Sequence, residues 1–281
     1  MEQSLGWPAP AKLNLMLRIV GRRADGYHEL QTVFQFLELQ DRLHFTPLVG
    51  QEIQLEASLD EVPEEENLVI RASRLLQRET GCKQGARIRL EKRLPMGGGL
   101  GGGSSDAATT LIALNHLWGT GLSRRQLARL GLSLGADVPI FIHGHSAWAE
   151  GVGEQLTDLD LPEIWYLVVI PACHVSTAEI FTAANLTRNS PRIRIRDFLH
   201  GERGNDCLPV VRERHPEVAS ALDWLEDHAP AHLTGTGACV FAGFASEDEA
   251  RRVYRLLPVD MQGFVSKGLN RSPLLDRIHG M

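Results

Sequence analysis

Residues 95–105 read Pro-Met-Gly-Gly-Gly-Leu-Gly-Gly-Gly-Ser-Ser, and this stretch decides the fold. Glycine adds no side chain to a core and loses backbone entropy on folding, so six glycines in eleven residues do not serve packing. Glycine does allow a positive φ and a close approach of backbone N–H groups to a ligand. An apolar segment predicted as a helix over residues 104–118 follows at once, and helix N-termini bind anions. The stretch therefore predicts a cradle for the phosphates of a nucleotide.

Two common phosphate loops do not fit the residues around this stretch. A P-loop requires a lysine directly after its last glycine, and here Ser104 follows. The dinucleotide fingerprint is met formally, with a strand pattern over 86–94 before it, but it also needs a second strand and an acidic residue about 20 positions later. Residues 107–136 contain no Asp or Glu, and residues 123–134 read as a second helix. A flexible linker is disfavoured too, because ordered patterns flank the stretch on both sides.

Composition bounds the class of protein. The chain has 281 residues, 43% hydrophobic and 23% charged, with a net charge of −6, which is typical of a globular protein of one large or two modest domains. No basic patch predicts a nucleic-acid partner, and no apolar run approaches the ~20 residues of a membrane span. The N-terminus lacks the pattern of a signal peptide. The cysteines lie far apart and predict reduced thiols in a cytoplasmic protein: Cys82, Cys173, Cys207 and Cys239.

Apolar periodicity predicts a mixed α+β protein. Residues 12–20 alternate as a strand, with Leu13 and Leu15 on a core face and Lys12 and Asn14 on the opposite face. Further strands are predicted at residues 31–39, 43–46, 51–57, 86–94 and 146–150. Helices are predicted at residues 67–79, 104–118 and 123–134.

An acid-rich segment, residues 158–163, is the best candidate boundary, and it divides the chain into residues 1–160 and 161–281. The second part reads as a strand, a helical region, two strands, a helix and a last strand. The predicted segments are 165–171, 177–184, a helical region between 206 and 224, 232–244 as strand-turn-strand, a capped helix from Ser246 to 257, and 263–267. This is the order of a split βαβ, or ferredoxin-like, domain.

Five segments together resemble the GHMP kinases, a family of small-molecule kinases. They are residues 8–15 (PAPAKLNL), 23–28 (RADGYH), 95–105, 135–139 (GADVP) and 234–239 (TGTGAC). They occur in the family's order and span most of the chain. Two of them, with Gly-Tyr-His and Gly-Ala-Asp-Val-Pro, resemble the branch that phosphorylates 4-diphosphocytidyl-2-C-methyl-D-erythritol, whereas the glycine stretch is shared more widely.

The resemblance implies transfer of the γ-phosphoryl group of ATP to the 2-hydroxyl of a cytidine diphosphate-linked methylerythritol, in the non-mevalonate isoprenoid pathway. It implies a ribosomal-protein-S5-domain-2-like ATP-binding domain (1–160), a ferredoxin-like domain (161–281) and an active site in the cleft between them. ATP is expected as co-substrate, with Mg²⁺ held by its phosphates and water rather than by protein ligands. We expect a monomer or weak homodimer with no nucleic-acid or membrane partner.

The resemblance also assigns catalytic roles. Asp137 would accept the proton of the substrate hydroxyl, Lys12 would favour the resulting alkoxide, and Asn14 would orient the substrate. From the residues alone, Asp137 followed by Pro139 is better read as a helix N-cap. The alternative for Lys12 is a solvated strand lysine, which is disfavoured because Lys12 opens an apolar strand and shares a face with Asn14. The alternative for Asn14 is a surface residue.

The remaining implied residues bind the two ligands. Tyr27 and His28 would hold the cytosine, with Phe181 as a second stacking face, although 27–28 also reads as a turn into a strand and Phe181 as a core residue. The 234–237 turn resembles the family's third glycine motif and reads equally as a hairpin. The residues expected to bind ATP are Pro95, Met96, Gly97, Gly98, Gly99, Leu100, Gly101, Gly102, Gly103, Ser104 and Ser105.

One further pattern predicts no site. His143 and His145 place two imidazoles on one side of a possible strand, but no third ligand is identifiable, so no protein metal site is predicted.

Two alternative functions stay open. The chain is compatible with another GHMP kinase that acts on a sugar alcohol or a mevalonate-like substrate. It is also compatible with a catalytically silent relative that binds ATP and substrate as a sensor.

Overall fold

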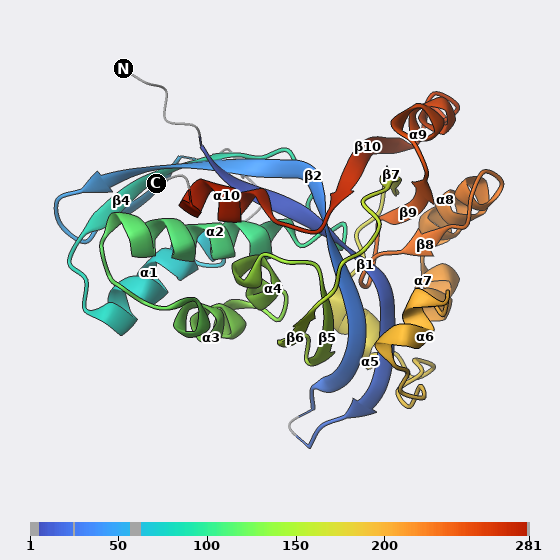
Figure 1. Cartoon of the computed structure of the whole chain (residues 1–281), viewed down its shortest axis with the longest axis horizontal. Helices are drawn as coiled ribbons and strands as arrows, with labels where there is room; N and C mark the ends of the chain where they lie inside the picture. The colour runs from blue at the N-terminus through green and yellow to red at the C-terminus, as the bar shows by residue number, and fades with distance from the viewer. Residues whose placement is uncertain (1–5, 25, 57–62, 280–281) are drawn as a thin grey trace.

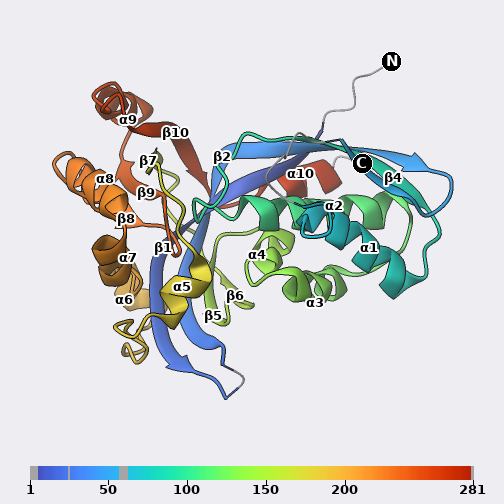
Figure 2. The same ribbon diagram turned by 180° about the vertical axis from the view of Figure 1, so that it is seen from behind.

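Two long strands join the two halves of the molecule. In the computed structural model, which describes residues 6–24, 26–56 and 63–279, β1 (Trp7–Arg22) pairs antiparallel with β2 (His28–Leu48). Their register runs from Trp7 opposite Leu43 to Arg22 opposite His28. Figures 1 and 2 show this ribbon passing from one group of helices to the other.

The first half is a sheet covered by helices. Its strands around β2 are β3 (Ile53–Glu56), β4 (Gly85–Glu91), β5 (Ala147–Gly151) and β6 (Gln155–Asp158). Its helices are α1 (Leu68–Thr80), α2 (Gly102–Leu117), α3 (Arg124–Leu134) and α4 (Val138–His143). The core between them centres on α2, where Leu111 and Leu114 are fully buried.

Local signals explain where these helices begin and end. The Asn67 side chain accepts a hydrogen bond from the Val69 N–H at 2.9 Å and caps α1, which ends at Gly81 with a φ of 69°. Ser123 and Gln126 form a complete capping box at the start of α3. The predicted helices at 67–79, 104–118 and 123–134 are confirmed within two residues at each end.

The second half has the predicted strand and helix order. Its strands are β7 (Trp165–Ile170), β8 (His232–Leu233), β9 (Val240–Phe244) and β10 (Gln262–Leu269), and they lie in the order β10-β7-β9-β8 with every pair antiparallel. This spatial order is that of a split βαβ domain, so the ferredoxin-like prediction is confirmed. The helices are α5 (Thr177–Thr182), α6 (Ile195–Leu199), α7 (Leu208–Arg214), α8 (Pro216–Glu226) and α9 (Glu247–Tyr254).

The first strand differs from its predicted pattern. The alternation predicts one core face and one face that carries Lys12 and Asn14, and the structure buries both: Leu13, Met16, Lys12 and Asn14 are all at most 4% exposed. Elements pack on both faces of β1, and a register shift between Asn14 and Met16 interrupts the alternation. The shift makes Leu17, rather than Met16, follow Asn14 along the face that lines a pocket.

Other expectations need smaller corrections. Residues 31–39 and 43–46 belong to one strand, β2, and residue 57 of the predicted strand 51–57 lies outside the described residues. The predicted capping box at Ser246 is incomplete, because the Glu249 carboxylate accepts from the Ala245 N–H instead of the Ser246 N–H. Helix α10 (Pro273–His279) was not predicted.

Helix α10 returns to the first half of the chain. The Ser272 N–H donates to the Gly144 oxygen at 2.9 Å, and Leu274 is fully buried in the core around α2. The division of the chain at residue 160 stays a prediction.

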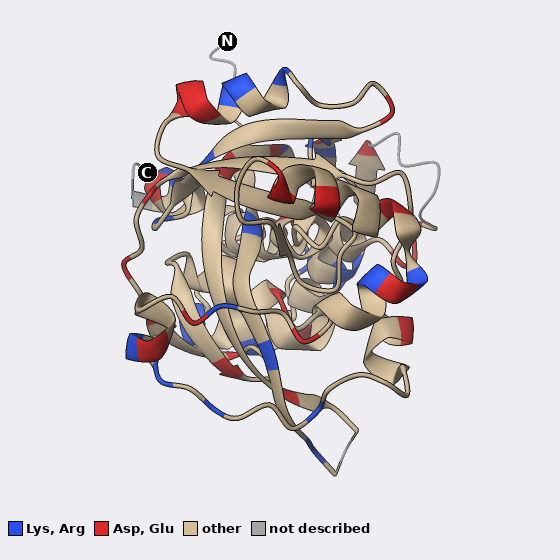
Figure 3. Cartoon of the chain, turned by 90° about the vertical axis from the view of Figure 1, so that its right-hand side faces the viewer, with Lys and Arg blue, Asp and Glu red and all other residues tan. Residues whose placement is uncertain are grey.

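Charged residues of both signs are interspersed over the face seen in Figure 3, with no continuous basic stripe. None of the helices in the described part of the chain has the length and hydropathy of a bilayer span.

Candidate active site

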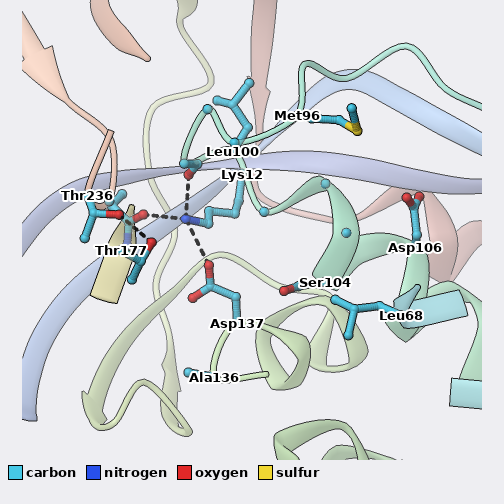
Figure 4. Close-up of a pocket in the computed structure, with 18 of the residues that line it drawn as sticks. Lys12, Leu68, Met96, Leu100, Ser104, Asp106, Ala136, Asp137, Thr177 and Thr236 are labelled. Carbon is cyan, nitrogen blue, oxygen red and sulfur yellow. Dashed lines mark hydrogen bonds and ion pairs between the residues drawn. The ribbon is translucent and has the colours of Figure 1, made fainter. Parts of the chain in front are cut away.

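A pocket of about 560 Å³ collects residues that are far apart in the chain. Strand β1 contributes Lys12 and Asn14, the glycine stretch contributes residues 95–104, and the loop before α4 contributes Asp137. The second half adds Phe181 of α5, and Gly235 and Thr236 of the turn between β8 and β9. Figure 4 shows Lys12 and Asp137 pointing toward one another at the centre of this pocket.

The glycine stretch has the backbone that its sequence predicts. Gly97, Gly99 and Gly101 have φ angles of 68°, 73° and 73°, which side chains with a Cβ rarely adopt. A Cβ on Gly99 would also lie 2.4 Å from the Thr234 oxygen. The stretch ends at the N-terminus of α2, so its N–H groups and those of the first helical turn meet at the pocket. Free backbone N–H groups arranged in this way can bind an anion.

Lys12 is held rigidly inside the pocket wall. Its ammonium donates to Asn14 Oδ1 at 2.5 Å and to the Gly99 oxygen at 2.8 Å, and it forms an ion pair with Asp137 Oδ2 at 3.2 Å. The Lys12 side chain is 3% exposed, which excludes its reading as a solvated strand lysine. The ammonium therefore ties the glycine stretch, β1 and the catalytic candidate Asp137 together.

Asp137 is accessible where Lys12 is not. Its side chain is 35% exposed, and it lies at the N-cap position of α4 without making a capping hydrogen bond. Asp137 therefore has the N-cap position that the residues alone favoured, but its carboxylate does not cap the helix. A carboxylate beside a buried ammonium and open to a pocket can accept a proton from a bound hydroxyl.

Asn14 has a scaffold position rather than a surface one. Its amide donates to Thr32 Oγ1 at 2.9 Å while its carbonyl oxygen accepts from Lys12. Its backbone N–H donates to Thr234 Oγ1 at 3.0 Å, and the residue is 4% exposed. Asn14 therefore fixes the Lys12 ammonium and the Thr234 turn.

The 234–237 turn closes the pocket from the second half. It connects β8 to β9 as a hairpin would, and Gly235 and Thr236 line the pocket. The Ala238 and Cys239 N–H groups donate to the Gly97 and Gly98 oxygens at 3.4 and 3.2 Å. The turn is therefore both a connection between two strands and part of the pocket wall.

The three residues expected at the cytosine are only partly brought together. His28 stacks on Phe181 with ring centroids 5.1 Å apart and planes 25° apart, and Phe181 lines the pocket. Tyr27 follows Gly26, whose φ is 91°, and is 64% exposed. Their roles in binding stay predictions.

A second cluster, which sequence reasoning missed, lies at the start of α2. The Lys92 ammonium contacts Asp41 Oδ2 at 2.6 Å and Asp106 Oδ2 at 2.8 Å. Asp41 is fully buried and also accepts from the Arg93 and Leu94 N–H groups at 2.6 and 2.8 Å. The neighbours of Asp41 in β2 are Gln40 and Arg42, so no local pattern marks it as buried.

The two carboxylates of this cluster share one cation. Burial, only partly offset by the Lys92 ammonium, raises the pKa of Asp106 to about 7. Burial alone would lower the pKa of Lys92, but the Asp106 and Asp41 carboxylates outweigh it and raise that pKa. Within the described residues, Asp106 Oδ1 is buried without a hydrogen-bond partner. Lys92 and Asp106 both line the pocket.

Comparisons with known proteins show the family of this chain. The chain matches the GHMP kinases N terminal domain over residues 67–145 and the GHMP kinases C terminal domain over residues 186–258. It is 56% identical to the 4-diphosphocytidyl-2-C-methyl-D-erythritol kinase of Shewanella halifaxensis, covering 98% of this chain and 97% of the relative. The enzyme of that name from Nitrosococcus oceani is 58% identical, with 96% of each chain covered.

The chain belongs to the 4-diphosphocytidyl-2-C-methyl-D-erythritol kinase family, a branch of the GHMP kinases. A crystal structure of a 4-(cytidine 5'-diphospho)-2C-methyl-D-erythritol kinase superposes with a TM-score of 0.80 at 34% identity, covering 93% of this chain and 98% of that one. A mevalonate kinase superposes with a TM-score of 0.70 at 16% identity, with 95% and 100% covered, and shares the fold. The predicted α+β GHMP kinase fold is confirmed.

Two sequence patterns lie outside this kinase site. His143 pairs with Asp158 through Nε2 and Oδ1 at 2.6 Å, and its ring lies 5.8 Å from that of His145. Among the described residues, no group of three His, Cys, Asp or Glu side chains is arranged to hold a metal ion. Residues 131–135 read Gly-Leu-Ser-Leu-Gly, but Ser133 is exposed at the end of α3 and donates to the Leu130 oxygen at 2.7 Å, so it forms no nucleophile elbow.

Proposed function

We propose that this chain transfers the γ-phosphoryl group of ATP to the 2-hydroxyl of 4-diphosphocytidyl-2-C-methyl-D-erythritol, giving the 2-phosphate and ADP. The observation that carries the proposal is the Lys12–Asp137 ion pair, 3.2 Å long, in the open pocket beside the glycine stretch. Relatives of that name are 55–58% identical over nearly the whole chain.

Phosphoryl transfer needs positioning and charge stabilisation more than covalent chemistry. In the proposed mechanism the N–H groups of the glycine stretch and of the first turn of α2 hold the phosphates. Asp137 accepts the proton of the attacking hydroxyl, and the Lys12 ammonium stabilises the negative charge that develops on its oxygen. Asn14 keeps Lys12 in place through the 2.5 Å hydrogen bond to its Oδ1.

The two ends of the pocket differ and suit the two ligands. Figure 4 shows Leu68 and Met96 on one side of the Lys12–Asp137 pair and Thr177 and Thr236 on the other. We assign the apolar end to the adenine of ATP because flat bases bury well against such side chains. The Thr177 and Thr236 end, which includes Phe181, is assigned to the cytidylyl substrate.

A Mg²⁺ ion carried by ATP would neutralise charge on the β- and γ-phosphates. Mg²⁺ prefers oxygen ligands and retains several waters, so a few protein oxygens suffice. The oxygens of Ser104 and Asp106 line the pocket at the glycine stretch and would lie nearest to it. A monomer or weak homodimer in the cytoplasm is also part of this proposal.

The test is a coupled ADP-release assay with Mg·ATP and four alcohols. We expect release with 4-diphosphocytidyl-2-C-methyl-D-erythritol and none above background with mevalonate, homoserine or galactose. Release with another alcohol alone would retain the kinase and replace its substrate. Binding of ATP without turnover of any alcohol would identify a sensor instead.

A further inference from the structure

Arg188 lies in the segment between α5 and α6 and makes an unusual set of contacts for a loop arginine. Its Nε donates to His28 Nε2 at 3.2 Å. Its two terminal nitrogens donate to the backbone oxygens of Phe181, Ala183 and Leu186 at 3.0, 2.7 and 3.1 Å. The guanidinium is partly buried, and all of these partners are neutral acceptors rather than carboxylates. These hydrogen bonds therefore fix the positions of the groups around Arg188 and do not neutralise its charge.

The contact with His28 determines which ring nitrogen of His28 carries a proton. A guanidinium has donors only, so His28 Nε2 must accept, and a neutral imidazole then carries its proton on Nδ1. Burial, followed by the positive charges of Arg188 and Arg22, lowers the pKa of His28, which agrees with a neutral ring. Arg188 thus sets both the tautomer and the orientation of His28.

Arg188 also fixes the other half of the stack. Phe181 lies under the His28 ring, with the centroids 5.1 Å apart, and its own backbone oxygen accepts from Arg188. One side chain therefore holds the ring of His28 and the main chain of Phe181 in a single arrangement. Phe181 in turn lines the pocket.

We propose that Arg188 is a positioning residue that prepares the pyrimidine end of the pocket by locking the His28–Phe181 stack and the Nδ1–H form of His28. This rests on the proposed function only in taking a cytidine nucleotide as the occupant of that end. Arg188 touches neither phosphate nor reacting atoms in this scheme, so its effect falls on binding of the pyrimidine nucleotide and not on the chemical step.

A nearby arginine provides a matched control. Arg192 is half-exposed and pairs with Glu29 at 2.8 Å and Glu150 at 3.3 Å on the surface. It carries the same charge in the same segment but contacts neither His28 nor Phe181 by any described hydrogen bond. Comparing Arg188→Met with Arg192→Met therefore separates the stack from the general loss of a cation.

The experiment measures binding of cytidine 5′-diphosphate and of ATP by calorimetry, and the His28 tautomer by ¹⁵N NMR of the ring. In Arg188→Met we expect the Kd for cytidine 5′-diphosphate to rise roughly tenfold, because the nucleotide must then order the His28–Phe181 stack that Arg188 holds in the wild type. The Kd for ATP should change less than about twofold. The ring nitrogens of His28 should show Nδ1–H in the wild type and a mixture of tautomers in the variant. Arg188→Lys, which retains the charge but not the planar fork, should fall between.

Several results would overturn the proposal. An Nε2–H ring in the wild type would remove the Arg188–His28 contact, and an equal rise in both Kd values would indicate a general loss of structure. A cytidine 5′-diphosphate Kd unchanged in Arg188→Met would leave Arg188 with no role in this end of the pocket. Because none of these readouts requires turnover, a wild type that binds cytidine 5′-diphosphate but phosphorylates no alcohol would defeat the proposed function alone.

Discussion

The pocket contains two lysine–aspartate clusters that look alike in sequence and differ in their surroundings. Lys12 pairs with Asp137, whose side chain is 35% exposed, while Lys92 pairs with Asp41 and Asp106, which are 0% and 4% exposed. Both lysines come from strands or strand ends of the first half, and both approach the glycine stretch. Asp137 and Asp106 both line the pocket, but the Asp137 side chain is by far the more exposed of the two.

The difference separates a reactive pair from a structural one. In the second cluster one ammonium pairs with two buried carboxylates, and Asp41 also accepts from the Arg93 and Leu94 N–H groups. This cluster holds the chain entering the glycine stretch against β2 and α2. Lys12 is even more buried than Lys92, but its partner Asp137 is open to a ligand. Replacing Lys12 should therefore act mainly on activity, and replacing Lys92 mainly on stability.

The largest effect is expected on activity, in Lys12→Met. Loss of the ammonium removes charge stabilisation at the attacking oxygen, and kcat should fall about a thousandfold. Asp137 is accessible enough for water to solvate it, so the melting temperature should move by only a few degrees. Steady-state kinetics and thermal unfolding on the same preparation measure both. A Lys12→Met variant whose melting temperature falls steeply together with its kcat would contradict the distinction between the two clusters.

The next largest effect is expected on stability, in Lys92→Met. Two buried carboxylates would then face one another without a cation, and the free energy of unfolding should fall by about 3–5 kcal/mol. Urea unfolding measures the change. Glu202→Gln is the control, because Glu202 belongs to a surface ion pair with Arg18 and should cost no more than about 1 kcal/mol. Equal losses in the two variants would mean that the buried cluster does not hold the fold.

A third test addresses the loop that both clusters support. Gly99→Ala places a Cβ 2.4 Å from the Thr234 oxygen at a φ of 73°, and the displaced loop should raise the KM for ATP at least about tenfold. Gly21→Ala is the control, because Gly21 lies in β1 outside the pocket, has no positive φ, and its Cβ would lie 3.4 Å from Glu29 Oε2, the end of a side chain. The KM for ATP of Gly21→Ala should stay near that of the wild type. Similar KM values in the two variants would show that the positive φ is not needed.

The smallest effect is a pH dependence confined to the second cluster. The pKa of Asp106 is raised from 3.8 to about 7. Between pH 3.8 and about pH 7, Asp106 therefore keeps a proton in the folded state that it has lost in the unfolded state. The free energy of unfolding should decrease as pH rises through this window, and Asp106→Asn should flatten the decrease. Urea unfolding at several pH values measures the slope. An unchanged slope in Asp106→Asn would assign the proton to another group.

Much of the fold was predictable because its signals are local. The bounds of α1 and α3, the glycine stretch and the order of strands and helices along the second half all follow from neighbouring residues. Burial of β1 on both faces was not predictable, because it depends on what the rest of the chain packs against each face. Helix α10 was missed for the same reason, since its apolar face packs on residues distant in the sequence.

The site divides in the same way. Lys12 and Asp137 were paired only through resemblance to a family, because residues alone favoured an N-cap for Asp137 and gave Lys12 no partner. The Asp41–Lys92–Asp106 cluster and Arg188 carry no motif, and their partners are distant side chains or backbone oxygens. Such contacts leave no periodic trace in a sequence, so geometry was needed to find them.

The most direct test of the reactive pair is Asp137→Asn, measured as kcat for 4-diphosphocytidyl-2-C-methyl-D-erythritol together with the Kd for ATP. The amide has the shape of the carboxylate but cannot accept the proton of the hydroxyl. We predict that kcat falls about a thousandfold while the Kd for ATP stays within about twofold of the wild type. A kcat within about tenfold of the wild type would contradict the account, because Asp137 would then not be the base.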